Sequence, residues 1–518
     1  MKNIQTLINQ DKISSYLNKP RQDFTKKDLI RFIEKNKIEM VNFRYVGGDG
    51  KLKTLNFLIR NESQLDRLLS AGERVDGSSI FPYIDASSSD LYVIPRYKTA
   101  YINPFSVIPA VDILCSYYTS DGAPLPSAPE NIVRKAHQVL KERTGLTFEA
   151  MGELEYYVLS GKQYLYPNKS QSGYQTSAPF CKWENIRIEA MQLIAQTGGK
   201  MKYSHSEVGN IPGAKQDMEQ HEIELFPMPI EDAADQVTIA KWILRMIGYK
   251  YGVTITFAPK IMVGYAGSGL HIHTRFIKND KNMMIKANAL SDTARKIIAG
   301  YLSLAPSLTA FGNTIPVSYL RLVPYQEAPT NICWGDRNRS VLVRVPLGWL
   351  NTRNMAKDAN PKETRLTGVA SLPAAGRVGQ ESKMQELVKY QTVEFRGPDG
   401  SADIYLLLAG LAVAARYGLE MKNALTLSDK LYVDVNIFSD KYKKVQENLG
   451  RLPTSCWESA DNLLKDRSIY EKDGVFSPIV IDGLVKKLKS YNDKDLSNRL
   501  FGKKEAIKKL VAEYIHCV

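Results

Sequence analysis

Charged residues recur at alternate positions inside stretches that otherwise have the apolar pattern of β-strands. The pairs are Glu153 and Glu155, His205 and Glu207, Glu222 and Glu224, His271 and His273, and Glu394 and Arg396. Because side chains alternate across a strand, residues i and i+2 share a face. Each pair alone fits a solvated strand face, which is the plainer interpretation. One shared polar cavity explains all of them with a single cause.

Such a cavity would be rich in carboxylates, which repel one another and are costly to bury without a cation. Divalent ions remove that cost. Mostly carboxylate ligands with one imidazole suit Mg²⁺ or Mn²⁺, whereas zinc favours more histidine and cysteine. The number of carboxylates predicts room for two or more ions, an arrangement that can hold phosphates during phosphoryl transfer.

Arginines gather in a second region, between residues 318 and 346. This region contains Arg321, Arg337, Arg339 and Arg344, interleaved with apolar residues such as Trp334. Guanidinium groups bind carboxylate and phosphate oxygens in pairs. Surface salt bridges would also explain the arginines, but their apolar neighbours favour arginines that line a binding site. Acids for metal and arginines for anions together predict nucleotide-dependent chemistry on an acidic small molecule.

The elements that would carry these residues fall into two groups. Residues 23–121 predict a small α+β domain, with a helix capped by Thr25 and a hairpin over 41–59 around a Gly-Gly-Asp-Gly turn. A proline-rich linker at 121–130 follows. Residues 122–518 alternate amphipathic helices with strands at 147–160, 269–276 and 392–397. Residues 1–22 are expected to form a polar arm, and about 350–384 to form an excursion from the core.

Composition excludes some classes of protein. The chain has 518 residues, 44% hydrophobic and 24% charged, so it is not a disordered polyelectrolyte. The net charge of +14 is spread over helical patterns that alternate lysines with acids, so it predicts neither a nucleic-acid nor a membrane partner. Five scattered cysteines without a CxxC motif fit a reducing compartment. With no signal-peptide pattern and no membrane-length apolar run, a cytoplasmic location is expected.

Seven blocks in order give the chain a family resemblance between residues 28 and 420. They are VDGSSI with SDLYVIP, GELEYYVL, HSEVG with QHEIEL, AGSGLHIH, SYLRLVPYQEAP, DRNRSVLVRVP and VEFRGPDGSADIYLLLAGLA. The sequence resembles glutamine synthetases of the bacterial and archaeal kind. The resemblance implies an α+β fold, with an N-terminal β-grasp domain and a catalytic domain in which helices surround a curved antiparallel half-barrel. It also implies homo-oligomeric rings, stacked as a dodecamer, with active sites between subunits.

The resemblance assigns roles to the residues singled out above. Two Mg²⁺ or Mn²⁺ ions would be held, the first by Glu155, Glu207 and Glu222, and the second by Glu153, His271 and Glu394. ATP phosphates would contact His273, Arg339 and Arg344, with Arg339 also facing the charge that develops during reaction. Glutamate would be held by Arg321 and Arg396, with a backbone contact from Gly267.

An ammonium site would complete the set, and it would be formed across the subunit interface. Asp76, with Ser79 beside it, would join Tyr174, Glu207 and Glu327 to bind ammonium. Asp76 would then remove a proton to free the nucleophile. Glu327 would belong to a lid that keeps water from the acyl phosphate.

The chain departs from the family pattern at three positions in the same region. Ala266 replaces an asparagine that contacts glutamate, Arg275 replaces a serine, and Thr392 replaces an arginine. Arg275 is expected to supply part of the charge lost at Thr392, on the nucleotide side of the site.

Three functions follow from these features. The first is ATP-dependent ligation of ammonia to the γ-carboxylate of L-glutamate, through γ-glutamyl phosphate. The second is a γ-glutamyl-amide ligase that uses a larger amine, suggested by Ala266 and by the segment 317–320. The third is a non-catalytic, ring-forming relative, which the complete set of metal-ligand positions disfavours.

Overall fold

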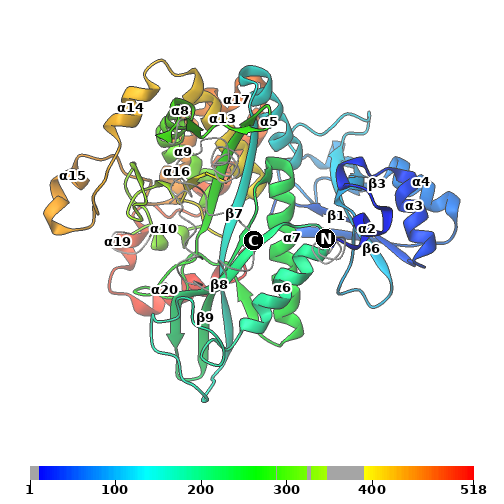
Figure 1. The fold of residues 1–518 in the computed structure, drawn as a ribbon, viewed down its shortest axis with the longest axis horizontal. Helices are drawn as coiled ribbons and strands as arrows, with labels where there is room; N and C mark the ends of the chain where they lie inside the picture. Colours follow the sequence, from blue (N-terminus) through cyan, green and yellow to red (C-terminus); the bar gives the residue numbers. More distant parts are fainter. Residues whose placement is uncertain (1–10, 287–288, 324–327, 347–389, 518) are drawn as a thin grey trace, which may run out of the picture.

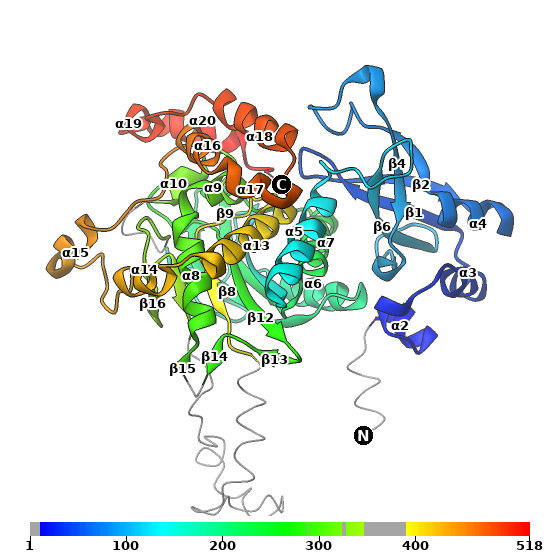
Figure 2. The ribbon, with the colours of Figure 1, turned by 90° about the horizontal axis from the view of Figure 1, so that it is seen from above.

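The computed structural model describes residues 11–286, 289–323, 328–346 and 390–517. Two sheets organise it, one of six strands near the N-terminus and one of ten strands in the rest of the chain. Figures 1 and 2 both show the six-stranded sheet and its helices beside the larger body, which contains the ten-stranded sheet. This arrangement confirms the predicted α+β fold.

The predicted hairpin forms the start of the small sheet. β1 (Met40–Val46) pairs antiparallel with β2 (Leu52–Leu58), and the turn between them includes Gly50 at a φ of 74°, a conformation that glycine adopts without strain. β1 also pairs in parallel with β6 (Ala110–Tyr118), giving the order β2-β1-β6-β4-β3 with β5 beside β6. The other strands are β3 (Glu73–Asp76), β4 (Asp90–Pro95) and β5 (Tyr101–Ile102).

Helices cover one side of this sheet. α3 (Lys26–Lys35) begins at the predicted cap, where the Thr25 side chain and Asp28 form a reciprocal capping box. α3 buries Leu29, Phe32 and Ile33 in the core of the small domain, and α4 (Glu62–Ala71) packs against α3. The apolar side chains of both helices therefore face the sheet, as expected for amphipathic helices.

The part of the expected arm that the structure describes packs onto the small domain. α2 (Lys12–Leu17) buries Ile13 in the same core, and Arg21 forms an ion pair with Asp11 at 2.5 Å. Residues 1–10, and the excursion expected at about 350–384, lie outside the described residues. The domain limits at 22 and 121 stay predictions.

The large sheet has the order β16-β17-β18-β12-β7-β9-β8, and all of these neighbours are antiparallel except β16 and β17. It curls into a half-barrel whose longest strands are β7, β8 and β9 (Figure 1). The strands are β7 (Thr147–Gly161), β8 (Met201–Pro212), β9 (Gln216–Leu225), β10 (Met228–Pro229), β11 (Thr254–Thr256), β12 (Leu270–Lys278), β13 (Lys281–Asn282), β16 (Trp334–Asp336), β17 (Val343–Val345) and β18 (Val393–Phe395). β14 (Ile285–Lys286) and β15 (Ala289–Leu290) form a separate hairpin.

Helices surround this sheet, and α13 (Ile404–Glu420) is the most deeply buried, packed against α5 and α8. The C-terminal helices α18, α19 and α20 lie together at one edge of the larger body (Figure 2). The helices are α5 (Pro129–Thr144), α6 (Glu184–Gln196), α7 (Ile230–Lys250), α8 (Asp292–Ser303), α9 (Ala305–Gly312), α10 (Ser318–Arg321), α14 (Ala424–Lys430), α15 (Lys443–Glu447), α16 (Cys456–Lys465), α17 (Arg467–Glu471), α18 (Pro478–Ser490), α19 (Leu496–Leu500) and α20 (Lys504–Glu513).

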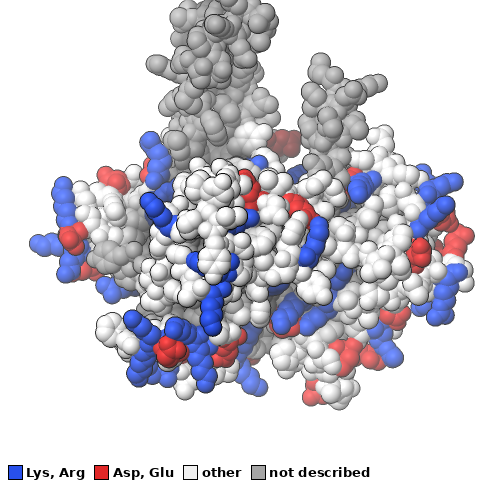
Figure 3. Space-filling model, turned by 90° about the horizontal axis from the view of Figure 1, so that it is seen from below, with Lys and Arg blue, Asp and Glu red and all other residues white. Residues whose placement is uncertain are grey.

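The long apolar run of the sequence is thus explained by α13, a core helix. Among the described residues, no single helix has the length and apolarity to cross a membrane, although α13 and α14 pass that test together as a pair bent by 108°. On the face drawn in Figure 3, lysines and arginines are interspersed with acidic and uncharged side chains, as the spread of charge in the sequence predicts.

Candidate active site

The charged pairs of the sequence lie on neighbouring strands of the large sheet. In the register of the strands, Glu155 lies opposite Glu222, and Glu222 lies opposite His205. One step along, Glu153 lies opposite both Glu224 and His271, and His273 lies opposite Glu394. Antiparallel pairing therefore converts pairs close in sequence into a two-dimensional array of acids and imidazoles across β8, β9, β7, β12 and β18.

One group of this array contains Glu153, His271 and Glu394, whose ligand atoms all lie within 4.8 Å of one another. His271 Nδ1 is 3.1 Å from Glu153 Oε2 and 3.6 Å from Glu394 Oε1. These three residues are the set that the resemblance assigns to the second ion. The structure brings them together, and their role as ligands stays a prediction.

The residues expected around the first ion divide between two overlapping groups. Glu155 and Glu222 lie with His271, and Glu222 also lies with His205 and Glu207. His205 Nε2 is 3.2 Å from Glu222 Oε1, and its Nδ1 is 3.5 Å from Glu207 Oε1. Glu222 is thus the carboxylate that joins the two halves of the predicted set.

The electrostatics of the array fit a bound cation. Burial, together with the carboxylates of Glu153 and Glu155, raises the pKa of Glu222 well above its usual range. Burial acts to raise the pKa of Glu153 too, but the imidazoles of His273 and His271 lower it. Among the described residues, both carboxylate oxygens of Glu394 lack a well-aligned hydrogen-bond donor. Oxygen-rich groups that repel one another are the donor set that Mg²⁺ or Mn²⁺ would hold together.

The predicted anion-binding arginines differ in their positions. Arg344 lies 3.0 Å and Arg396 3.2 Å from the carboxylate of Glu394, so both border the array. Arg321 is buried, and its NH1 donates to the carbonyl of Gly397 at 2.9 Å. Arg339 is exposed, and its carbonyl accepts a hydrogen bond from Arg396.

A cavity of about 230 Å³ connects the acids with the arginines. Its wall includes Glu155, Glu207, His271, Arg321 and Arg396. Gly267, expected to give glutamate a backbone contact, also lines it, and so does Ala266. The cavity is smaller than pockets for drug-sized ligands, which measure roughly 300–1,000 Å³. Carboxylates on one wall and guanidinium groups on another suit a small ligand that carries negative charge.

The residues expected to bind ammonium are only partly brought together in one chain. The ring centres of Tyr174 and His205 are 5.5 Å apart, which places Tyr174 beside the group that contains Glu207. Asp76 lies at the end of β3 in the small domain, apart from β8 and β9 in Figures 1 and 2, and accepts a hydrogen bond from Ser79 at 2.6 Å. The hydroxyls of Ser79 and Ser78 lower the pKa of Asp76. Glu327 lies outside the described residues.

Two of the departures from the family pattern make contacts of their own. Arg275 forms an ion pair with Glu149, 2.6 Å away on β7. The Thr392 hydroxyl lies 2.8 Å from His273 Nδ1, on the opposite side of the ring from Glu153. The hypothesis that Arg275 supports nucleotide binding stays a prediction.

Two residues of the array were missed by sequence reasoning. Gln220 donates to Glu155 Oε2 at 3.1 Å, and it shares a face of β9 with Glu222 and Glu224. Glu224 was noted as a charged residue without a role, and it lies with Glu153 and His273 and pairs with Lys202. Extending each i, i+2 pair by two more residues along the strand would have found Gln220.

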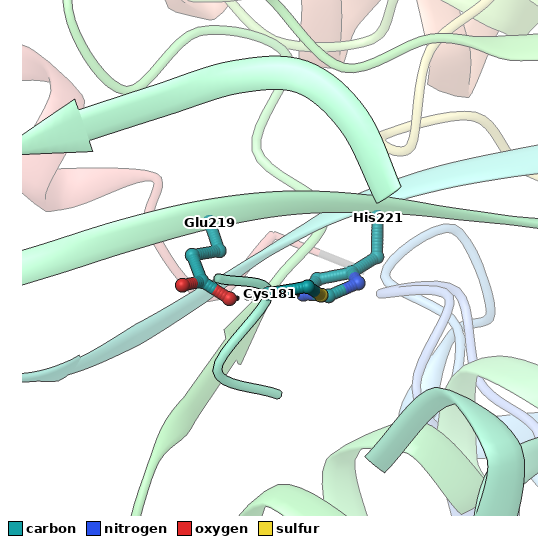
Figure 4. A group of neighbouring side chains, drawn as sticks. All are labelled: Cys181, Glu219 and His221. Atoms are coloured by element: carbon teal, nitrogen blue, oxygen red, sulfur yellow. Dashed lines mark ion pairs between the residues drawn. The ribbon is translucent and has the colours of Figure 1, made fainter. Parts of the chain in front are cut away.

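A separate group of potential ligands lies on the other face of β9. Figure 4 shows Glu219 and His221 side by side on the strand, with Cys181 brought to them by a loop. Arg187 NH1 lies 3.1 Å from His221 Nδ1 and 3.8 Å from Cys181 Sγ. The Glu219 carboxylate accepts from the backbone N–H groups of Lys182 and Trp183 and from Asn168.

These contacts already occupy the atoms that would have to bind a metal ion. A cation already lies beside His221 and Cys181. Since Arg187 donates to Nδ1, the neutral His221 ring carries its proton on Nε2 and cannot offer that atom to an ion. Burial lowers the pKa of His221, which favours this neutral form. The group therefore ties the 181–183 loop to β9.

Comparison with known proteins places this geometry in a family. A family model of the glutamine synthetase β-grasp domain matches residues 37–120, and one of the glutamine synthetase catalytic domain matches residues 126–387 and 378–499. Curated relatives include a glutamine synthetase of Staphylococcus epidermidis, 29% identical over 85% of this chain and 98% of that protein. One from Staphylococcus aureus is 30% identical over 71% of this chain and 82% of that protein.

Solved structures agree on the fold. A glutamine synthetase of Plasmodium falciparum superposes with a TM-score of 0.70 at 21% identity, covering 92% of this chain and 97% of that one. GmaS in complex with ADP superposes with a TM-score of 0.69 at 16% identity, covering 90% of this chain and 96% of that one. At these identities the likeness shows the fold alone.

The chain belongs to the glutamine synthetase family. Within that family it is a glutamine-synthetase-like, ATP-dependent carbon–nitrogen ligase. Enzymes of this family use divalent metal and ATP, and the acid and imidazole groups described above are the candidate places for metal.

Proposed function

We propose that this protein joins ammonia to the γ-carboxylate of L-glutamate at the expense of ATP, through γ-glutamyl phosphate, and forms glutamine, ADP and phosphate. The observation that carries the proposal is the small cavity with metal-type carboxylates on one side and the buried Arg321 and the guanidinium of Arg396 on the other. Few small-molecule reactions need both kinds of wall. Phosphoryl transfer to an amino-acid carboxylate is one of them.

In this proposal each wall has a separate task. Glu155, Glu207 and Glu222 hold one Mg²⁺ or Mn²⁺ ion, and Glu153, His271 and Glu394 hold another. The ions supply positive charge to the phosphates of ATP when they are bound. Arg321 binds the α-carboxylate of glutamate as a charge-assisted pair, and Arg396 lies near the γ-carboxylate. His273, Arg339 and Arg344 face the phosphates and stabilise developing negative charge.

The ammonium side of the proposal needs a second subunit. Asp76 and Ser79 lie on an edge of the small domain, apart from Tyr174 and Glu207 of the same chain. In a homo-oligomer they reach the site of a neighbour, where Asp76 takes a proton from ammonium. We therefore propose a ring-forming homo-oligomer, stacked as a dodecamer, with glutamate, ammonium and ATP as its small-molecule partners.

A γ-glutamyl ligase that uses a larger amine is the second candidate. It is supported by Ala266 on the cavity wall, where the short side chain leaves room, and by the likeness of the fold to GmaS. A retained acidic cage around a small cation, formed by Glu207 with Tyr174 nearby, favours ammonia instead.

The test is phosphate release with ATP, Mg²⁺ and glutamate, comparing ammonium with methylamine, ethanolamine and putrescine and identifying the products by mass. Saturable release with ammonium, giving glutamine, is the expected result. Preference for a larger amine would overturn the ammonia proposal in favour of the amide ligase. No turnover with any amine would contradict both candidates.

A further inference from the structure

Three successive backbone carbonyls, two of them in residues that line the cavity, are each held by a side chain from a different part of the fold. The carbonyl of Tyr265 accepts from Lys260, that of Ala266 from the Tyr157 hydroxyl at 2.8 Å, and that of Gly267 from Gln220 at 3.0 Å. Tyr157 lies on β7 and Gln220 on β9, while Lys260 follows β11. All three donors are at most 2% exposed.

Such anchoring is notable because the wall segment 264–268 has no regular secondary structure of its own. It contains two glycines, and Gly264 has a φ of 89°. A chain of this kind is flexible unless other groups hold it. Buried hydrogen bonds to each carbonyl remove that freedom, and the N–H of Ser268 adds a fourth by donating to the Pro259 carbonyl at 3.0 Å.

The segment is also fitted closely against the predicted glutamate-binding arginine. A Cβ atom at Gly267 would lie 2.5 Å from the Pro259 carbonyl and 3.0 Å from Arg321 Cγ. The backbone of Gly267 thus fills the space between the Pro259–Lys260 turn and the stem of Arg321. A shift of the segment would move this wall of the cavity relative to the Arg321 guanidinium.

Gln220 adds a connection to the acidic wall. Its amide nitrogen contacts Glu155 Oε2 at 3.1 Å as well as the Gly267 carbonyl, and its oxygen accepts from the N–H of Gly209 at 3.1 Å. The same Glu155 oxygen accepts from the N–H of Gly269 at 2.7 Å. Glu155 therefore contacts the C-terminal end of the wall segment twice, through Gln220 at Gly267 and directly at the N–H of Gly269.

We propose that Tyr157, Gln220 and Lys260 are positioning residues that fix the 265–267 backbone as the amino-acid wall of the cavity. Gln220 further couples that wall to the ion held by Glu155. In this proposal the fixed backbone orients glutamate in place of the side-chain contact that an asparagine at position 266 would make. This inference deepens the proposed function and rests on it for the identity of glutamate.

The first experiment compares Tyr157→Phe with Tyr156→Phe as a matched control. Tyr156 is equally buried on the opposite face of β7, and within the described part of the chain its hydroxyl has no hydrogen-bond partner. The loss of one net hydrogen bond predicts glutamate binding about 2- to 10-fold weaker in Tyr157→Phe, with nucleotide binding unchanged. Isothermal titration measures both affinities. Equal glutamate affinity in the two variants would overturn the anchoring role.

The second experiment measures coupling, which a purely structural role would not change. Glutamate affinity is titrated with and without Mn²⁺ for the wild type, Gln220→Leu and Tyr157→Phe. Mn²⁺ should strengthen glutamate binding in the wild type and in Tyr157→Phe, and this gain should shrink in Gln220→Leu. An unchanged gain in Gln220→Leu would refute the coupling.

Hydrogen exchange separates this inference from the proposed function. Amide exchange over residues 262–270 should be faster in Tyr157→Phe than in Tyr156→Phe without any substrate. If the wild type fails to bind glutamate yet this difference is seen, the proposed substrate is wrong and the anchoring stands. If the wild type binds glutamate and exchange is equal in both variants, the anchoring is wrong and the function stands.

Discussion

Glu394 lies between two guanidinium groups and an imidazole. It is fully buried, it pairs with Arg344 and Arg396, and it lies 3.6 Å from His271. Neutralising it removes a candidate oxygen ligand and leaves two guanidinium groups without their shared counter-charge. Glu394 thus links the predicted metal ligands to the arginines that are predicted to bind anions.

The substitution Glu394→Gln should weaken Mn²⁺ binding by more than about 10-fold, because changes even to groups that only support metal ligands cost about 10–100-fold. Binding of Mn²⁺, followed by electron paramagnetic resonance, checks this without reference to activity. Glu189→Gln is the control, since Glu189 pairs with Lys250 at the surface. Equal Mn²⁺ affinity in the two variants would remove Glu394 from the ligand set.

At the scale of elements, alternation along single strands was enough to predict which residues share a face. The strands carrying Glu153, His271 and Glu394 were predicted in this way, whereas the hairpin over 41–59 also needed its turn residues and the helix at Thr25 was predicted from its capping residue. The irregularity in β8 was not: its pairing with β9 shifts between Ser206 and Asn210, which places Glu207 in a bulge. A bulge inserts a residue without a pattern of its own.

Long-range placement was likewise beyond the sequence pattern. The closeness of Cys181 to His221, and the anchoring of the 265–267 carbonyls by Tyr157 and Gln220, depend on how distant segments pack. No local spacing signals such contacts. The array of acids was predictable because every strand in it repeats the same two-residue period.

The junction between the two domains predicts a pH effect on stability. Glu130, in the first turn of α5, accepts a hydrogen bond from the N–H of Tyr117 on β6. Burial raises the pKa of Glu130 from 4.5 to about 7, although that hydrogen bond opposes the rise. Between these values the folded chain binds a proton that the unfolded chain does not. The contribution of Glu130 to the free energy of unfolding therefore falls as the pH rises between these two pKa values.

Glu130→Gln should lack this dependence. The free energy of unfolding of the wild type, relative to the variant, should fall by at most about 1.4 kcal/mol per pH unit across that window. Urea unfolding at several pH values measures the difference. A difference that stays constant with pH would show that Glu130 is ionised equally in both states.

At the scale of the whole molecule, the separation of Asp76 from the acid array predicts complementation between chains. Asp76→Asn and Glu394→Gln should each be inactive alone. Co-assembled in equal amounts, they should recover about one quarter of wild-type activity, because random neighbours pair an intact Asp76 with an intact Glu394 in about one site in four. Activity is measured on co-expressed oligomers, with separately assembled oligomers mixed afterwards as the control.

If the co-expressed sample recovers no activity, the result would contradict a site shared between subunits. It would place Asp76 either in the site of its own chain or outside the chemistry. Recovery in both samples would instead indicate that subunits exchange after assembly.

The order of strands across the large sheet also bears on how the protein is made. Of the strands of the large sheet, the ribosome releases β7, β8 and β9 first, so Glu153, Glu155, Glu222 and Glu224 emerge before β12 and β18. Until His271 and His273 follow on β12, Glu153 and Glu155 lack these imidazole neighbours. The nascent sheet therefore closes late, and free divalent ions in the surrounding solution can act on the folding of the new chain before they act in any reaction.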